Sequence, residues 1–158
     1  MADNNLSKAV INTVNSVVAD LEKAGADITP LMTSFAETVY NSIQKNRDSG
    51  GRWDGNENEI TVFSGGSHKW KDLAESTKKQ YRKKGWSLVP TLRREGFLEQ
   101  SISITPNKTS LSITANADYA RIHQLGGDNM PPRPYILLQE EDLQEFYDTI
   151  EDYVHSLL

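Results

Sequence analysis

A change in hydrophobic period along the chain most constrains its fold. Before residue 46 and after residue 139, apolar residues recur every three or four positions, which is the spacing of a helix with one buried face. Between residues 101 and 115 they alternate with Ser and Thr, as in a strand with one buried face. These periods predict an α+β fold, in which a small antiparallel sheet (a hairpin at about 101–115 plus short strands) packs with N-terminal and C-terminal helices.

Three amphipathic helices are predicted. The first covers 6–24 and stops at Gly25, and the last covers about 140–156. The second covers about 30–45, with Thr29 as N-cap and Pro30 at the first helical position, and 48–51 ends it. Their expected buried residues are Leu6, Val10, Val14, Val17, Val18 and Leu21; Leu31, Met32, Phe35, Val39 and Ile43; and Leu143, Phe146 or Tyr147, Ile150, Val154 and Leu157.

The middle of the chain is less regular. Residues 47–69 hold five glycines and predict a mobile loop or insertion, with a short strand at 59–63. A weaker helix is expected at about 70–84, with its basic face solvated or against a partner. One helical turn is expected at 119–125. Residues 130–134 should be extended, because they include three prolines, and 135–138 should form a short strand or lead into the last helix.

Chain length predicts a single domain spanning 1–158, since domains commonly have about 150 residues. Within it we expect an N-terminal helical pair (1–46), the Gly-rich loop (47–69), and an α+β core with an acidic final helix (70–158). The absence of cysteine excludes disulfides and thiol catalysis. No apolar run approaches the roughly 18 residues of a membrane span, and no secretory signal is visible, so a soluble protein without a membrane partner is expected.

Charge is strongly segregated. Residues 69–94 carry nine basic side chains against two acidic ones, in a chain whose formal net charge is −5. Residues 139–158 carry seven acidic side chains and neither Lys nor Arg. Two interpretations stay open at this point. The segments neutralise each other within one fold, or they meet head to tail between copies of the chain.

The sequence offers little for catalysis or for metal binding. The histidines His68, His123 and His155 lack metal-ligand spacing. Asp118 and His123 with a serine would make a triad, but no nucleophile-elbow motif accompanies them. The carboxylates of the last helix are more typical of a solvated face than of a divalent metal site. We therefore predict no enzyme, no catalytic residue, no cofactor, no metal and no small-molecule substrate.

The basic segment also resembles a small nucleic-acid footprint, because Trp70, Tyr81 and Trp86 are interleaved with its cations. A solvated helix is the simpler interpretation, and DNA contact is the minor one. The predicted basic contact surface consists of Lys78, Lys79, Arg82, Lys83 and Lys84.

Four motifs follow one another from residue 70. They are Trp70-Lys-Asp-Leu73-Ala74-Glu-Ser76-Thr77; Leu92-x-x-x-Gly96-Phe97-Leu98-x-x-Ser101-Ile102; Tyr119-Ala120-Arg-Ile-His123-Gln124-Leu-Gly126-Gly127; and Pro132-Arg133-Pro134-Tyr135-Ile136. Their order and spacing resemble the phage virion morphogenesis family, the tail completion proteins of contractile-tailed, Mu-like phages and prophages. The resemblance covers about residues 70–138 and, more loosely, the flanking helices.

This resemblance implies a structural role in virion assembly. Proteins of the family are thought to complete the tail at its head-proximal end, as a ring that makes the tail competent to join the head. The implied partners are phage tail and neck proteins and further copies of the chain, in the host cytoplasm during assembly and then in the virion. A DNA-contacting neck or packaging accessory, using residues 69–94, is the alternative. The positions singled out as structural or interface residues are Trp70, Leu73, Thr77, Gly96, Leu98, Tyr119, His123, Gly126, Arg133 and Pro134.

Arg133 is the most informative of these positions. Its neighbouring prolines stiffen the chain, so its planar guanidinium loses less entropy when it binds carbonyls or a carboxylate. Two roles remain open from the sequence. Arg133 braces the fold against the acidic helix or the turn that holds His123, or it makes a contact between subunits.

Overall fold

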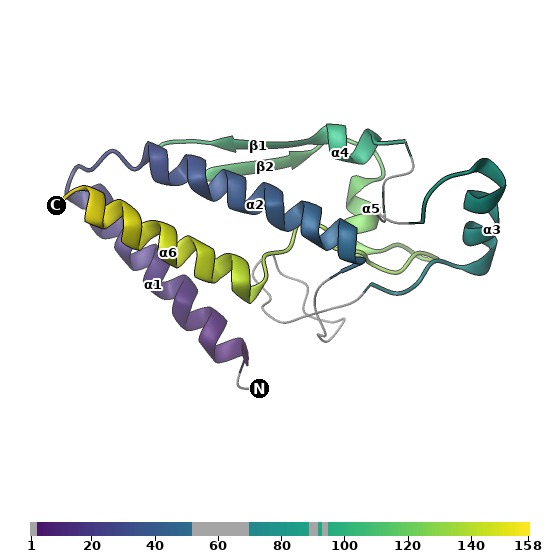
Figure 1. The fold of residues 1–158 in the computed structure, drawn as a ribbon, viewed down its shortest axis with the longest axis horizontal. Coiled ribbons are helices and arrows are strands. Elements are labelled where there is room, and N and C mark those ends of the chain that lie inside the picture. The colour runs from purple at the N-terminus through teal and green to yellow at the C-terminus, as the bar shows by residue number, and fades with distance from the viewer. Residues whose placement is uncertain (1–2, 52–69, 89–91, 93–94) are drawn as a thin grey trace.

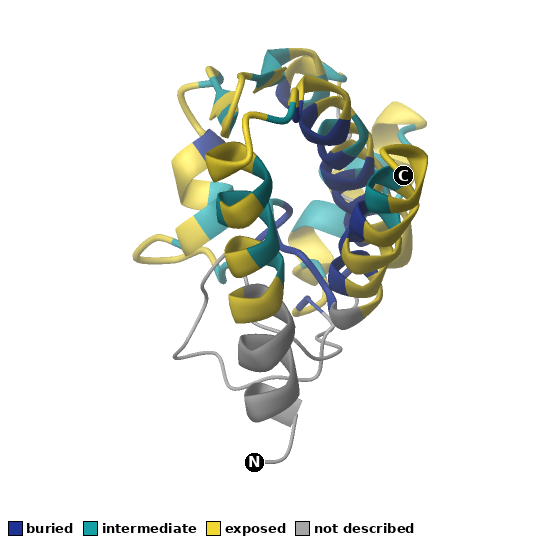
Figure 2. Cartoon of the chain, turned by 90° about the vertical axis from the view of Figure 1, so that its left-hand side faces the viewer, coloured by how far each residue is buried: buried dark blue, intermediate teal, exposed yellow. Residues whose placement is uncertain are grey.

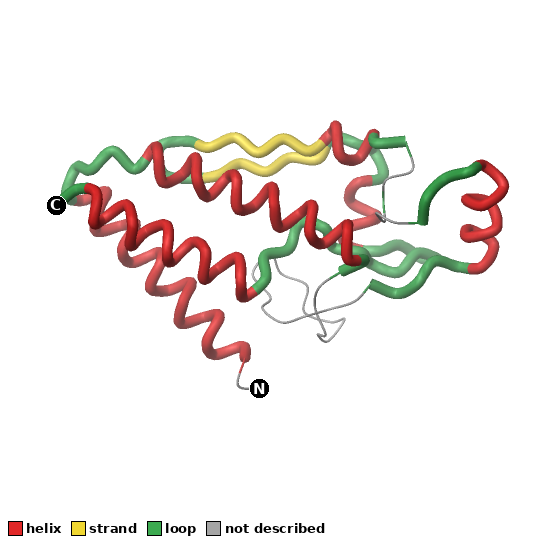
Figure 3. Tube along the Cα trace, in the orientation of Figure 1, coloured by secondary structure: helices red, strands yellow, loops and turns green. Residues whose placement is uncertain are grey.

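The computed structural model describes residues 3–51, 70–88, 92 and 95–158 (Figure 1). Its fold is α+β, as predicted, and Figure 3 shows one β-hairpin along the upper edge of the molecule, with the long helices below it. The elements are α1 (Asp3–Lys23), α2 (Thr29–Ser49), α3 (Glu75–Lys84), α4 (Phe97–Ser101), β1 (Ile102–Pro106), β2 (Leu111–Ala115), α5 (Ala120–Leu125) and α6 (Glu140–Ser156).

The elements pack in layers around α2. The hairpin lies on one side of α2, α6 lies on another, and α1 packs against α6 (Figure 1). Figure 2 shows that buried positions gather along the inner faces of α2 and α6, whereas the described residues of α1 are intermediate or exposed. The rings of Phe35 on α2 and Phe146 on α6 lie at the centre of the core, with centroids 4.4 Å apart. The core is therefore mainly a contact between helices, which the hairpin covers on one side.

The first two helices agree with their predicted extents, with two differences at α2. The predicted N-cap is wrong, because Ile28 occupies that position and Thr29 is already helical. Asp27 explains the shift, since its Oδ1 accepts the Thr29 N–H at 3.1 Å. The second difference is that α2 runs to Ser49, where Gly50 in the left-handed conformation (φ 71°) ends it. All five apolar residues predicted for its inner face are buried.

The last helix matches its predicted range and resolves one alternative. Phe146 is buried, whereas Tyr147 is 40% exposed. Leu143 and Ile150 are also buried, as expected. The burial of Leu157 is a wrong prediction, because α6 ends at Ser156 and Leu157 is 54% exposed beyond the last turn. In α1, Val14, Val17, Val18 and Leu21 pack against the core, while the side chains of Leu6 and Val10 lie outside the described part of the chain.

The hairpin confirms the period-two prediction. β1 and β2 pair antiparallel, with Ile104 opposite Ile113, and half-buried residues alternate with exposed ones along both strands. The turn closes where Asn107 N–H donates to the Ser110 carbonyl at 2.7 Å. Within the described residues this sheet has two strands only. The short strand predicted at 59–63 and most of the predicted loop 47–69 lie outside the described residues.

The weaker helix predicted at 70–84 is only half right. α3 begins at Glu75, and the chain before it has no regular structure. Trp70 instead joins the core at 7% exposure, and its backbone N–H donates to the Gly50 carbonyl at 2.8 Å. A large aromatic residue gains more from this burial than from extending a mostly charged helix by one turn. The short α4 was not predicted, and residues 135–138 lead into α6 without forming a strand.

Candidate interaction surface

Two of the sequence motifs meet where α5 faces the proline-rich segment. α5 is the helical turn predicted at 119–125, and its first residue, Ala120, is buried. The carbonyl of His123 accepts the backbone N–H of Arg133 at 2.7 Å. Pro134 is buried next to Arg133. Pro131, Pro132 and Pro134 have no backbone N–H, so Arg133 is the residue of 131–134 that can donate a backbone hydrogen bond to α5.

Gln124 fixes the same segment from its other side. Its Oε1 accepts the N–H groups of Tyr135 and Ile136, both at 3.1 Å, and its Nε2 donates to the Ile136 carbonyl at 2.9 Å. One side chain therefore satisfies three backbone groups that no sheet supplies here. Sequence reasoning did not single out Gln124, although a glutamine between His123 and a Gly pair was a visible signal.

Gly126 is required where α5 ends. Its backbone has φ 82° and ψ 173°, a region that is essentially restricted to glycine. A Cβ placed there would lie 3.0 Å from Pro132 Cδ and 3.1 Å from the Met130 carbonyl oxygen. Gly126 therefore allows the chain to turn tightly from α5 into the segment that carries Arg133.

The Arg133 side chain joins this turn to the start of the α3 region. Arg133 is 6% exposed, and its Nη2 donates to the carbonyls of Lys71 at 3.0 Å and Asp72 at 3.3 Å. Burial lowers the pKa of Arg133, and the nearby charge of Asp72 opposes that shift. This geometry favours the brace over the interface role. The expected partners were wrong, however, because the guanidinium binds neither the acidic helix nor the turn at His123.

Asp72 also holds the first turn of α3. Lys78 Nζ lies 2.6 Å from Asp72 Oδ2 and 2.9 Å from Glu75 Oε1. The hydrogen bonds from Lys78 and from the Leu73 N–H lower the pKa of Asp72. The hydrogen bonds to Asp72 and Glu75 raise the pKa of Lys78. Lys78, one of the five predicted basic contact residues, is therefore already paired within the chain.

His123 is half-buried beside Tyr119, whose ring meets it edge-on with centroids 5.5 Å apart. Burial lowers the pKa of His123, and the positive charge of Arg133 lowers it further. Both causes favour the neutral imidazole. His123 thus contributes a packed ring and a backbone carbonyl to the joint between α5 and Arg133.

The other predicted motif residues are spread over the fold. Trp70 and Leu98 belong to the core, while Leu73 and Thr77 are half-buried near α3. Gly96 has φ 80° and is the N-cap of α4. These positions do not form a common site with Arg133; they hold together the elements around it.

Beside the Arg133 joint, α5 presents an apolar outer face. Tyr119, Ile122 and Leu125 recur every three residues and are 42%, 41% and 52% exposed. Met130 lies in the turn that follows α5, where its backbone pairs with that of Gly127, and it is 37% exposed. Phe97, 62% exposed, lies on α4 at the same end of the hairpin, because α4 enters β1 where β2 leads to α5. Large exposed apolar side chains gathered at one end are typical of a contact surface.

A second surface is the outer side of α3. None of its ten residues, all of which the structure describes, is buried. Lys79, Arg82 and Lys83 are exposed, and Lys84 Nζ lies 4.8 Å from the centroid of the Trp86 ring. This basic face is exposed in the single chain, which agrees with both predicted alternatives, a solvated face and a face against a partner. The other basic residues of the segment, Lys69, Arg93 and Arg94, lie outside the described residues.

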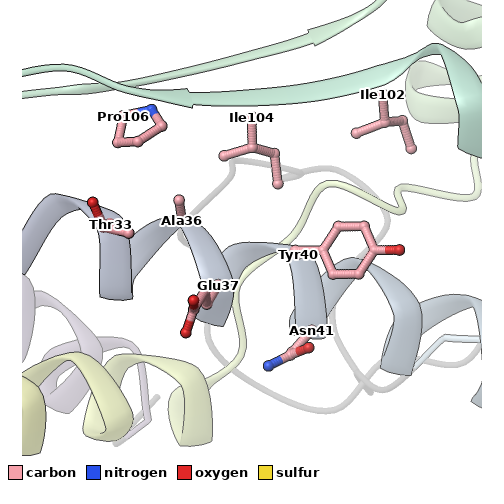
Figure 4. A pocket seen from close by; sticks show the side chains of 8 residues that line it. All are labelled: Thr33, Ala36, Glu37, Tyr40, Asn41, Ile102, Ile104 and Pro106. Carbon is pink, nitrogen blue, oxygen red and sulfur yellow. The ribbon is translucent and has the colours of Figure 1, made fainter.

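An open groove of about 550 Å³ separates α2 from β1. Figure 4 shows Ile102, Ile104 and Pro106 pointing from β1 toward α2, with the Tyr40 ring below Ile102. The α2 side is mixed, since Thr33 and Glu37 also line the groove. Such a shallow, half-apolar groove has no convergent polar groups that would orient a small substrate.

Neither a metal-binding cluster nor a membrane-spanning helix is found in the described part of the chain. No group of three or more His, Cys, Asp or Glu residues there could hold a metal ion. Within the same residues, no helix combines the length and the hydropathy that crossing a bilayer requires.

Comparison with known proteins identifies the class. A family model described as the phage virion morphogenesis family matches residues 9–155, and the chain belongs to that family. One relative is the "Mu-like prophage FluMu G protein 2" of Haemophilus influenzae, which is 28% identical over an alignment of 158 positions that covers 94% of this chain and 96% of the relative. No solved structure matches significantly. The chain is therefore a phage virion assembly protein, in agreement with the resemblance read from its motifs.

Proposed function

We propose that the chain is a non-enzymatic tail completion protein that acts as a ring at the head-proximal end of the tail. The family match across residues 9–155 carries this proposal. The structure supports it with exposed contact surfaces on α3 and α5, while the described residues offer no metal cluster. The proposed partners are tail and neck proteins and further copies of the chain, first in the host cytoplasm and then in the virion.

The proposal is tested by removing the gene from its phage or prophage and examining the tails by negative-stain microscopy. Tails of normal length that fail to join heads are expected, and the wild-type chain supplied in trans should restore joining. Head-joined, infectious particles at the normal yield without the protein would overturn the proposed function.

A DNA-contacting role in the neck is the second candidate, and the exposed cations of α3 favour it. Binding to DNA through phosphates would weaken steeply as salt rises, because each neutralised phosphate releases a counterion. A titration of duplex DNA at two salt concentrations measures this dependence. Absence of binding at low salt would remove the candidate.

A further inference from the structure

Two oppositely charged helix faces are exposed on this chain, and they lie too far apart to meet within one copy. We define the basic α3 face as Lys79, Arg82 and Lys83, and the acidic α6 face as Glu145, Asp148 and Asp152. Figure 1 places α3 at one end of the long axis, and α6 runs toward the opposite end. Among the described residues no ion pair joins these helices. Neutralisation of the two helices within one copy is therefore not seen among the described residues, while Lys69, Arg93 and Arg94 of the basic segment lie outside them.

The basic α3 face has the spacing of a helical contact surface. Its three residues follow one another at intervals of three and one, so they lie on one side of the helix. The opposite side holds Thr77, Lys78 and Tyr81, which are half-buried. Lys78 is occupied by Asp72 and Glu75, whereas no described acidic side chain of the same copy pairs with the basic α3 face.

The acidic α6 face has a matching pattern. Its residues recur at intervals of three and four, opposite the buried Leu143, Phe146 and Ile150. All three are exposed, and residues 139–158 contain no Lys or Arg that would neutralise them. Glu145 accepts a hydrogen bond from Thr38, and Asp148 accepts one from Gln144, so neutral partners orient both carboxylates, and no described cation forms an ion pair with either.

We propose that the basic α3 face of one copy docks on the acidic α6 face of the next copy. Each copy then uses two different surfaces, which is a heterologous contact, and repetition closes into a ring when the rotation permits. This contact deepens the proposed ring, and it rests on that part of the proposed function. The Arg133 brace positions α3 for docking, because it binds the carbonyls of Lys71 and Asp72 just before the helix begins.

A second copy fits the basic α3 face better than DNA does. The complementary charges are present in every copy at the spacing of one helix face, whereas the chain as a whole has a net charge of −5 and would repel a phosphate backbone. Non-specific DNA affinity depends on multiple phosphate contacts, and α3 offers few uncompensated cations for them.

Cross-linking tests the contact directly. A zero-length carbodiimide joins lysine amines to carboxylates that touch, and an equal mixture of ¹⁴N-labelled and ¹⁵N-labelled protein distinguishes links between copies from links within one copy. The measurement is made on concentrated protein at low salt and on purified tails that contain the protein. Mixed-label links from Lys79 or Lys83 to the acidic α6 face are expected, and they should decline as salt rises because exposed charges are screened.

Charge reversal makes the test specific. The first variant carries Lys79→Glu, Arg82→Glu and Lys83→Glu, and the second carries Glu145→Lys, Asp148→Lys and Asp152→Lys. Each alone should lower the tail-joining yield at least about tenfold, because the reversal places like charges opposite each other across the contact. A chain with both sets of reversals should recover most of that yield. The control variant Lys23→Glu, Lys45→Glu and Lys108→Glu changes the net charge as much as the first variant, at exposed residues outside α3, and should keep normal joining.

The outcomes separate this contact from the proposed function. Absence of mixed-label links in tails, together with no recovery by the double reversal, would overturn the contact even if the protein is required for tail completion. Tails that join heads normally without the protein would overturn the proposed function, while the links in concentrated protein would still report the contact. Loss of DNA binding in the α3 variant, with no effect of the α6 variant on joining, would assign the basic face to DNA and also overturn the contact.

Discussion

α2 and α3 show how differently one chain can use two polar helices. α2 contains nine buried residues, four of them polar, whereas α3 contains none. Two of these polar residues bond to the segment before α6, since Ser42 Oγ donates to the Leu137 carbonyl at 3.0 Å, and Asn46 Nδ2 donates to the carbonyls of Tyr135 at 3.1 Å and Leu137 at 2.8 Å. α3 relies on an ion pair at its first turn and on the Arg133 brace.

α2 is part of the folded core, whereas α3 lies outside it. Around α2, hydrogen bonds are enclosed by apolar packing, and removing one leaves a buried group without its partner. On α3, the charges face water, where single ion pairs contribute little to stability. Substitutions should therefore affect folding most at α2, less at the Arg133 joint and least on α3, while their effects on assembly follow the reverse order.

The largest effect on stability is expected from Asn46→Ala. Asn46 is fully buried, and its loss would remove the amide donor to the Tyr135 carbonyl and leave the Leu137 carbonyl with Ser42 Oγ as its donor. The free energy of unfolding should fall by about 2–4 kcal/mol, measured by urea denaturation. The exposed Asn41 on the same helix is the matched control, and Asn41→Ala should change stability by less than about 0.5 kcal/mol. Equal effects of the two substitutions would contradict the enclosed hydrogen bonds at α2.

Arg133→Ala should rank second. The substitution removes the donor to the Lys71 and Asp72 carbonyls, and we expect a loss of about 1–3 kcal/mol in a thermal or urea melt. Arg133→Lys should lose part of this, because an ammonium keeps the charge without the planar fork. Amide exchange in α3 should also accelerate. The exposed Arg121 on α5 serves as the control, through Arg121→Ala. A wild-type melt for Arg133→Ala would move Arg133 to the assembly surface.

A smaller effect is expected from acid at His123. Because its folded pKa is lowered, the unfolded chain binds the proton more readily, starting near the ordinary His value of about 6.5. The stabilising contribution is complete above that pH and is lost as pH falls toward the folded pKa. Asp27 and Asp72 also have lowered pKa values, and their stabilising contributions are lost only below about pH 4, outside this window.

The measurement is the melting temperature of the wild type, His123→Phe and His155→Phe between pH 7 and pH 5. The wild type and His155→Phe should lose stability together as pH falls, since His155 is exposed. His123→Phe keeps a ring against Tyr119 without a titrating group, so its melting temperature should decline less. Parallel curves for all three proteins would show that His123 is equally solvated in the folded and unfolded states.

Periodicity was enough to predict the α+β class, the hairpin and the three long helices, because each buries one regular apolar face. It ended α2 too early, since Asn46 and Arg47 continue the buried face with polar side chains. Arg47 is 1% exposed and pairs with Glu99 on α4 at 3.3 Å. Only the folded arrangement shows such a distant partner, so a pattern based on hydrophobicity counts these residues as exposed.

The candidate site was predictable in its residues and not in its partners. The prolines around Arg133 indicated a fixed guanidinium, but its acceptors are backbone carbonyls of residues 71 and 72, which carry no side-chain signature. The role of Gln124, which stands in the same motif as His123, could not be predicted for the same reason, since all three of its hydrogen bonds join backbone groups. Trp70 was placed on a helix because nothing in its neighbours indicates that the core lies behind it.

The smallest effect on stability is expected from neutralising the basic α3 face. In a chain carrying Lys79→Gln and Lys83→Gln, both substituted side chains remain in water, so the free energy of unfolding should stay within about 0.5 kcal/mol of the wild type. The same chain should join heads less efficiently than the wild type, because two of the three attracting charges are gone. Urea denaturation and the tail-joining yield, measured on one preparation, compare the two effects. A loss of stability as large as that of Arg133→Ala would mean that α3 unfolds together with the core, which would contradict the distinction between α2 and α3.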